Sequence, residues 1–231
     1  MNMEENIFAQ GQLILIDKPF EWTSFDVIRK IRYLTKTKKV GHAGTLDPLA
    51  TGLLIVCTGK FTKKINEYMA QEKEYIGSIT LGAVTPTYDL ESLPQDFKPV
   101  EHITQEELIE ATKKFTGAIL QTPPIHSAIK KEGKRVYELA RRGEDVKLDP
   151  RPVTISRFDI TKVEMPVVHF KVVCSTGTYI RSLANDFGES LGCGGHLSGL
   201  CRTRIGSFLL KDALSIEAFE AYANEHVRKD N

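Results

Sequence analysis

The chain has 231 residues, a net charge of +1, 41% hydrophobic residues and 26% charged residues. This composition is typical of a globular protein and excludes a disordered, fibrous or membrane-embedded chain. No apolar run approaches the roughly 18 residues of a membrane span, and the N-terminal MNMEENIFAQ has no signal-peptide pattern. We therefore expect a cytoplasmic protein, and the lack of repeats or an obvious linker predicts a single domain over residues 1–231.

The first half of the chain contains several clear patterns. Gln12 to Asp17 is an apolar run that predicts a buried strand. Thr23 or Ser24 is expected to cap a helix whose apolar stripe is Val27, Ile28, Ile31 and Leu34. Further along, the sequence predicts a glycine- and proline-rich loop over Gly41 to Pro48, an apolar run over Leu53 to Cys57, and an alternating strand over Glu72 to Leu81.

The second half continues with mixed helices and strands. Thr104 and Glu107 form a capping-box pattern for a helix to about Phe115. Two strands, Val153 to Met165 and Val168 to Cys174, are expected to pair around Pro166. A helix from near Tyr179 to Gly192 follows, and Ser215 caps a last helix that uses Ile216, Phe219 and Tyr222. Without a regular strand–helix alternation, the pattern favours an α+β fold.

Basic residues gather in two segments. Arg29 to Lys39 holds six basic residues and no acid, and Lys130 to Arg142 holds six against two glutamates. Asp89 to Glu110, by contrast, holds seven acids and one lysine. Such segregation can form a basic face for a polyanion, although solvated helix faces would give the same pattern.

The four cysteines do not form a CxxC pair, so neither a zinc knuckle nor a redox pair is indicated. We expect reduced, mostly buried thiols. The nucleotide-binding patterns GxxxxGK[ST] and GxGxxG are also absent. The sequence therefore predicts neither a metal nor a nucleotide cofactor.

The stretch GHAGTLDPLATGLL holds a carboxylate on a constrained loop. Its three glycines permit tight backbone geometry, and Pro48 biases Asp47 towards extended conformations. His42 and Thr45 add a ring and a hydroxyl. By local chemistry alone, Asp47 is better explained as an ordinary Asp-Pro turn residue.

Two further stretches carry candidate groups. In STGTYIRSLAND, Arg181 is suited to offset the charge of a buried carboxylate, although a surface arginine would look the same. Tyr75 in KEY could stack on an extruded base or transfer a proton. Tyr179 suits either a pocket wall or a core contact, and a core tyrosine would also explain Tyr75.

Together these stretches resemble the TruB family of tRNA pseudouridine synthases. The resemblance runs in order through GQLILIDKPFEWTSFDVIRKIR, GHAGTLDPLATGLLIVCTGKFTK, KEYIGSITLGAVTPTYD, PPIHSAIKKEGKRVYELARRG, GTYIRSLANDFGESLG and LCRTRIGSF. It implies the pseudouridine synthase fold, a mixed and mostly antiparallel sheet flanked by helices, with a catalytic cleft across the sheet. Many members also carry a C-terminal PUA-type RNA-binding module, but this sequence stops soon after its last predicted helix, so we expect it to lack that module.

The resemblance implies a role for each matching residue. Asp47 matches the essential aspartate, Arg181 the arginine that pairs with it, and Tyr75 the tyrosine that stacks on the target base. Five further positions are expected to bind the substrate. His42 enters the T-loop, and Tyr179 and Leu200 line the uracil pocket. Lys18 belongs with Pro19 to a block that mainly supports the catalytic loop, and Lys130 lies in the second basic segment.

The implied reaction isomerises uridine 55 in the T-arm of tRNA to pseudouridine, without a cofactor or metal, in an enzyme expected to be a monomer. The base is extruded, its glycosidic bond is broken, and the uracil rejoins the ribose through C5. Asp47 could add to C1′, add to C6, or assist removal of a ribose proton to give a glycal. The basic segments would then contact phosphates around the T-arm.

Three positions depart from the family pattern. Glu21 stands where glycine is usual, Phe61 where alanine is common, and Cys201 where arginine is frequent. None of them coincides with Asp47, so they concern loop geometry and RNA contacts more than chemistry. A noncatalytic RNA-binding or tRNA-folding chaperone on the same fold is the alternative function, and a small-molecule hydrolase is a second one, which leaves the basic segments without a role.

Overall fold

A computed structural model describes residues 6–125, 130–131, 134–135 and 148–227. The chain forms two units: Met1–Tyr75 with Leu200–Asn231, and Ile76–Gly199. The boundaries fall within two strands, β4 (Lys73–Leu81) and β10 (Gly195–Ile205), so each strand contributes residues to both units. We call the units unit 1 and unit 2 and describe each by itself.

Strand β3 (Ala50–Thr58) is the centre of the sheet in unit 1. It pairs antiparallel with β1 (Leu13–Lys18) and with β2 (Val40–Ala43), and parallel with the first residues that β10 contributes to this unit. The short strand β11 (Phe208–Leu209) closes a hairpin with the end of β10. Strand β3 is almost entirely buried and pairs with β2, so the two strands hold both ends of the loop that joins them.

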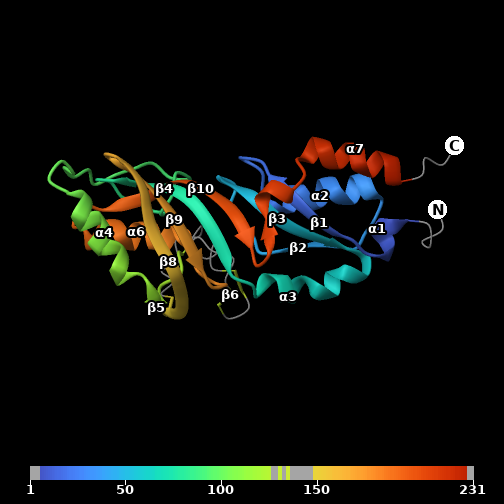
Figure 1. The fold of residues 1–231 in the computed structure, drawn as a ribbon, viewed down its shortest axis with the longest axis horizontal. Helices are drawn as coiled ribbons and strands as arrows, with labels where there is room; N and C mark the ends of the chain where they lie inside the picture. The colour runs from blue at the N-terminus through green and yellow to red at the C-terminus, as the bar shows by residue number, and fades with distance from the viewer. Residues whose placement is uncertain (1–5, 126–129, 132–133, 136–147, 228–231) are drawn as a thin grey trace. The chain divides into compact units, whose positions relative to one another are not determined.

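Two helices of unit 1, α2 (Ser24–Thr35) and α7 (Ile216–His226), pack on one face of these strands (Figure 1). A complete capping box between Thr23 and Asp26 starts α2, and the predicted apolar stripe faces the core. A salt bridge of 2.7 Å between Lys30 Nζ and Glu220 Oε2 joins the two helices. The remaining helices of this unit are α1 (Ile7–Gln10), η1 (Gly59–Lys64), α3 (Ile65–Met69) and η2 (Leu210–Asp212).

Unit 2 is built on strands in the order β10-β4-β9-β8-β5. The long strands β8 (Arg151–Glu164) and β9 (Val167–Cys174) form an antiparallel pair around Pro166, and β5 (Gly117–Gln121) pairs antiparallel with β8. Two short strands, β6 (Lys130–Lys131) and β7 (Lys134–Arg135), form a separate pair.

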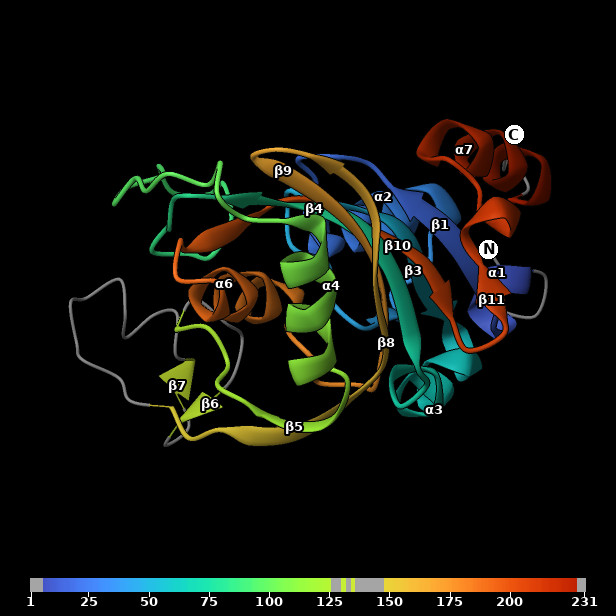
Figure 2. The same cartoon turned by 60° about the vertical axis from the view of Figure 1, so that its left-hand side comes forward.

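Helices α4 (Gln105–Lys114) and α6 (Ile180–Ser190) lie beside β8 in unit 2 (Figure 2). Their packing depends on aromatic rings: Phe187 of α6 lies 5.4 Å from the ring of Phe158 on β8 and 6.4 Å from Phe115, which ends α4. Burial of rings of this size contributes strongly to a core. The helix that carries Arg181 is therefore held against the sheet.

The sequence located nine of the elements, β1, α2, β3, β4, α4, β8, β9, α6 and α7. The α+β class with a mixed, mostly antiparallel sheet is confirmed. One expectation was wrong in part, because Gly41 to Ala43 belong to strand β2 and not to the loop that runs to Pro48. Strands β5 and β10 were not predicted, since their residues do not alternate between apolar and polar. Tyr222 is only partly covered, with 37% of it exposed. The single catalytic domain remains a prediction.

Candidate functional site: the loop that carries Asp47

Asp47 lies on the short loop between β2 and β3, and it is partly exposed. The loop begins at Gly44, whose φ of 90° is a conformation that side chains disfavour. Its turn is closed by a hydrogen bond of 3.1 Å from the Ala50 N–H to the Asp47 carbonyl. The sequence thus places a carboxylate on a tight turn, as predicted.

Ser24, the first residue of α2, holds the peptide groups next to Asp47. Its Oγ donates to the Leu46 carbonyl at 3.1 Å and accepts from the Leu46 N–H at 2.9 Å. Ser24 is buried, so water competes little for these bonds. The residue before Asp47 is therefore fixed on both sides of its Cα.

Lys18 supports the same loop from the end of β1. It is fully buried, and its Nζ donates to the carbonyls of Trp22 at 2.5 Å, Pro19 at 2.9 Å and Pro48 at 3.3 Å. Burial lowers the pKa of Lys18 from 10.5 to about 8, although the nearby Asp47 carboxylate acts in the opposite direction. Lys18 therefore fits a role in shaping the loop, because its ammonium is occupied by backbone carbonyls.

Arg202 is the third buried group behind the loop. From β10 its Nε donates to the Leu53 carbonyl at 2.8 Å, and a terminal nitrogen donates to the Gly44 carbonyl at 3.0 Å. Gly52 lies against it with a φ of 100°, and a Cβ there would meet the Arg202 carbonyl oxygen at 2.4 Å. Glycine is thus required at position 52 for β10 to approach β3.

Glu21 connects the segment after β1 to the loop. Its N–H donates to the Pro48 carbonyl at 3.0 Å, and its own φ is 65°. The left-handed conformation is strained for a residue with a side chain and is normal for glycine. This geometry explains why the family pattern has glycine at this position.

Other predicted site residues of unit 1 lie on neighbouring strands. His42 lies on β2 opposite Val56, and burial together with the positive charge of Arg202 lowers its pKa. Leu200 pairs with Ala50 between β10 and β3, three residues after Asp47. Tyr75 is buried on β4. Because its pKa is lowered, His42 is favoured as the neutral imidazole at neutral pH.

In unit 2, Arg181 pairs with a carboxylate that the sequence reasoning did not find. Arg181 Nε lies 3.6 Å from Asp89 Oδ2, and each side chain is only 6% exposed. A terminal nitrogen of Arg181 also donates to the Thr87 carbonyl at 3.3 Å. Asp89 follows the strand β4 after a loop, and no helical or strand spacing connects it to Arg181 in the sequence. The pairing of Arg181 with Asp47 remains a prediction.

Tyr179 immediately precedes α6, and its backbone is clamped by a buried glutamine. The Tyr179 N–H donates to Gln121 Oε1 at 2.8 Å, and Gln121 Nε2 donates to the Tyr179 carbonyl at 3.1 Å. Gln121 is therefore a positioning residue that sequence reasoning missed. For Lys130 the structure gives only the strand β6, and most of the Lys130 to Arg142 segment lies outside the described residues.

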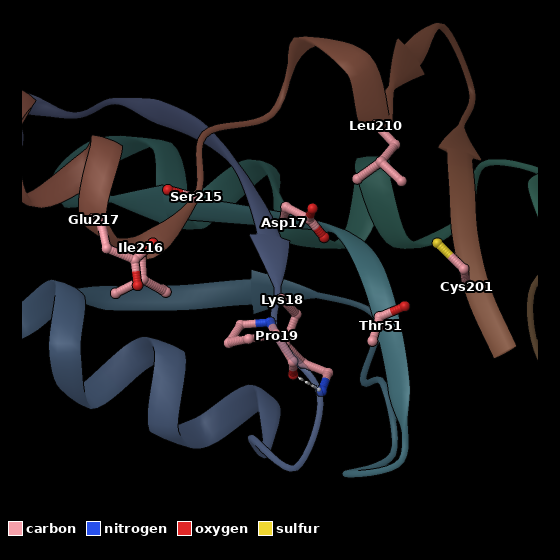
Figure 3. Close-up of a pocket in the computed structure, with 9 residues that line it drawn as sticks. All are labelled: Asp17, Lys18, Pro19, Thr51, Cys201, Leu210, Ser215, Ile216 and Glu217. Atoms are coloured by element: carbon pink, nitrogen blue, oxygen red, sulfur yellow. Dashed lines mark hydrogen bonds between the residues drawn. The ribbon is translucent and has the colours of Figure 1, made fainter. Parts of the chain in front are cut away.

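A cavity of about 340 Å³ opens in unit 1 beside Lys18 (Figure 3). In Figure 3, Thr51 and Cys201 lie on one side of Asp17, and Ser215, the N-cap of α7, lies on the other side with Ile216 and Glu217. Of the predicted site residues that the structure describes, only Lys18 belongs to this lining. The cavity therefore does not coincide with the loop that carries Asp47.

Metal ligands and thiols complete the chemistry of the described residues. Within them, no group of three or more His, Cys, Asp or Glu side chains is arranged to hold a metal ion. Cys57, Cys174 and Cys193 are buried and free, and Cys201 is partly buried and free, in line with the expected thiols. No helix among the described residues is long and apolar enough to cross a membrane.

Comparison with solved structures defines the class of the protein. The chain matches a structure described as a Cbf5-Nop10-Gar1 complex with a TM-score of 0.73 and 26% identity, over 99% of this chain and 60% of the solved chain. A Nop10-Cbf5 complex of the archaeal box H/ACA sRNP matches with a TM-score of 0.70 and 25% identity, over 97% of this chain and 57% of that one. This chain thus spans about 60% of the length of these neighbours, and it has the fold of the pseudouridine synthases.

The chain belongs to the TruB family of pseudouridylate synthases. The family's N-terminal domain model matches residues 32–180, and the C-terminal domain model of tRNA pseudouridylate synthase B matches residues 181–230. It is 52% identical to tRNA pseudouridine synthase B of Flavobacterium johnsoniae, over 92% of this chain and 96% of the relative. Identity to the enzyme of the same name from Phocaeicola vulgatus is 50%, over 94% and 95% of the two chains.

Proposed function

We propose that this chain isomerises uridine 55 in the T-arm of tRNA to pseudouridine, as a monomer and with Asp47 as the essential carboxylate. The observation that carries the proposal is the fixed position of the Asp47 loop. Ser24, Lys18 and Arg202, all buried, bond the backbone of that loop from three different elements. The two relatives that are 52% and 50% identical to this chain are named tRNA pseudouridine synthase B, which supports the same activity.

A fixed loop suits the proposed chemistry. The reaction breaks the bond between C1′ and N1 and forms a bond between C1′ and C5 of the same uracil. C5 then loses its proton and N1 gains one, and the carboxylate must stay aligned while the uracil turns. Small displacements of a catalytic group cost much of the rate, and a loop held on both sides avoids them. Asp47 acts in its ionised form in each of the three mechanisms open to it, whether through C1′, through C6 or through a glycal.

The other residues have supporting roles in this proposal. Tyr75 stacks on the extruded uracil, Tyr179 and Leu200 line its pocket, and His42 fills the gap in the T-loop. A neutral imidazole at His42 favours such stacking, because it carries less hydration than the charged form. Arg181 provides the positive charge for Asp47.

Lys18 and Lys130 stand apart from the residues that touch uracil. The ammonium of Lys18 is bound to three carbonyls, so its contribution to substrate binding is indirect, through the loop. Lys130 is proposed to contact RNA phosphates.

The test is release of tritium from a T-arm transcript labelled at C5 of uridine. The wild-type chain should release tritium with one equivalent per target uridine. Asp47→Asn should abolish release while RNA affinity stays within about twofold, because the amide keeps the size of the side chain and removes its charge. Asp96→Asn, in an exposed loop of unit 2, is the matched control and should behave as the wild type.

Two results would contradict the proposal. An active Asp47→Asn variant would show that the carboxylate is not essential. RNA binding without tritium release by the wild type would favour the noncatalytic chaperone.

A further inference from the structure

Helix α2 exposes a face of alternating aromatic and basic residues. Its buried side packs on the core, whereas Phe25 and Tyr33 on the outer side are 58% and 67% exposed. Their spacing places them on one face of the helix together with three cations. The face, here called the α2 strip, consists of Phe25, Arg29, Arg32, Tyr33 and Lys36.

The cations of the α2 strip lie against its rings. The guanidinium groups of Arg29 and Arg32 are each 6.0 Å from the Phe25 ring centre, and Lys36 Nζ is 4.2 Å from that of Tyr33. Arg32 is further fixed by a 3.0 Å hydrogen bond from its guanidinium to the Val40 carbonyl. The rings and charges are therefore partly ordered without a ligand, which lowers the entropy lost on binding.

The charge of this surface is mainly positive, with Asp26 as its one acid on α2, where it forms a salt bridge with Arg29. Arg29 to Lys39 contains six basic residues and no acid, and Lys38 and Lys39 extend the exposed cations beyond the helix. Lys30 is excluded from the α2 strip, because it faces α7 and pairs with Glu220. A face that served only for solubility would not need two large exposed rings among its cations.

The α2 strip begins beside the loop that carries Asp47. Phe25 directly follows Ser24, whose Oγ bonds the Leu46 peptide next to the catalytic residue. Another exposed ring, Phe20, directly precedes Glu21, whose N–H bonds the Pro48 carbonyl. Exposed rings thus adjoin two of the residues that bond the peptides around Asp47.

We propose that the α2 strip binds the unpaired nucleotides of the substrate RNA that flank the target uridine. Rings that stack on bases, with cations between them that contact phosphates, are the combination that binds single-stranded RNA. The proposal rests on the proposed function for the identity of the RNA. It adds a contact surface outside the uracil pocket, on residues that take no part in the chemistry.

Binding of a T-arm stem-loop RNA, measured by fluorescence anisotropy over a series of KCl concentrations, tests the proposal. Phe25→Ala with Tyr33→Ala should raise Kd by at least about fivefold and leave its salt dependence unchanged, because stacking involves no counterion release. Arg29→Gln with Lys36→Gln should lower the slope of log Kd against log [KCl] by about 1.5, since each lost phosphate contact removes about 0.7 to 0.9. The rate at saturating RNA should remain within about twofold for both variants.

Matched controls come from exposed residues of unit 2. Phe97→Ala removes an exposed ring and Lys114→Gln an exposed cation, and neither should change Kd or the salt slope. Thermal unfolding of all variants should coincide with the wild type, since the substituted side chains are exposed.

Three results would overturn the proposal. The first is an unchanged Kd and salt slope in both double variants, and the second is an equal loss of RNA affinity in the control variants. The third is self-association of the wild type in sedimentation that the aromatic double variant loses, because it would assign the face to a second copy of this chain. Because the readout is binding, absence of tritium release by the wild type would refute the proposed function and leave this test intact.

Discussion

Ser24 and Leu46, 22 residues apart, are joined by two hydrogen bonds through one hydroxyl group. The bond to the carbonyl and the bond from the N–H fix both peptide groups of Leu46, and Asp47 is the next residue. The N-terminal end of α2 therefore determines where the carboxylate lies.

Ser24→Ala is expected to slow turnover by about tenfold to a hundredfold, because the Asp47 loop loses its fixed position. The buried Leu46 groups would also lose their partner, so we expect a loss of about 1–3 kcal/mol in the free energy of unfolding. Single-turnover tritium release and urea unfolding measure the two effects. Ser190→Ala, which removes a local bond to the Phe187 carbonyl, is the control for stability alone, and an equal rate loss there would refute the positioning role.

Asp89→Asn is expected to impair turnover through Arg181. The pair is buried and 3.6 Å apart, so neutralising Asp89 removes a buried negative charge that faces the Arg181 guanidinium, at a cost of about 3–5 kcal/mol in stability. Arg181→Lys should be severely impaired too, because an ammonium cannot reproduce the planar fork of a guanidinium. A double-mutant cycle on the single-turnover rate measures the coupling, and additive effects would show that Asp89 does not act through Arg181.

Lys18 should give the folded protein a distinct pH dependence. Its pKa is about 8 in the folded chain against an ordinary 10.5, so between these values the unfolded chain binds more protons. The free energy of unfolding contributed by Lys18 therefore rises with pH across this window, by about 3 kcal/mol in total. Urea unfolding of the wild type and of Lys18→Met from pH 7 to pH 10.5 measures it as the difference between the two. Lys211→Met is the exposed control, and a difference that stays flat or falls with pH would contradict the shift.

Glu21→Gly is expected to stabilise the chain. Relief of the left-handed strain at a φ of 65° should raise the free energy of unfolding by about 1–2 kcal/mol. The greater conformational freedom of glycine in the unfolded chain should lower it by about 0.5–1 kcal/mol. The net gain is therefore about 0.5–1 kcal/mol by urea unfolding, since the exposed side chain packs against little. Glu21→Ala keeps the Cβ and should gain nothing. Equal stabilisation by alanine would show that the carboxylate, and not the backbone, is responsible.

The sequence by itself determined the elements whose signals lie within one or two turns. The cap of α2, the capping box at Thr104 and the apolar stripe of α2 depend on residues at most four apart, and the structure has all of them, with Thr23 as the cap of α2. The alternation of β8 and β9 around Pro166 is equally local. Asp47 could be selected because the resemblance covers its loop, and Gly44 and Pro48 shape that loop in any context.

Only the tertiary structure decided what holds the site residues in place. Arg202 reaches Gly44 across 158 positions of the chain, and Arg181 reaches Asp89 from another element, at separations that no spacing rule relates. Gln121 similarly meets Tyr179 across 58 positions. Such contacts exist only after strands distant in sequence have paired, because a buried charge or amide takes whichever partner the closed chain brings within reach. The proposed catalytic aspartate was therefore visible in the sequence, whereas the groups that fix its loop were not.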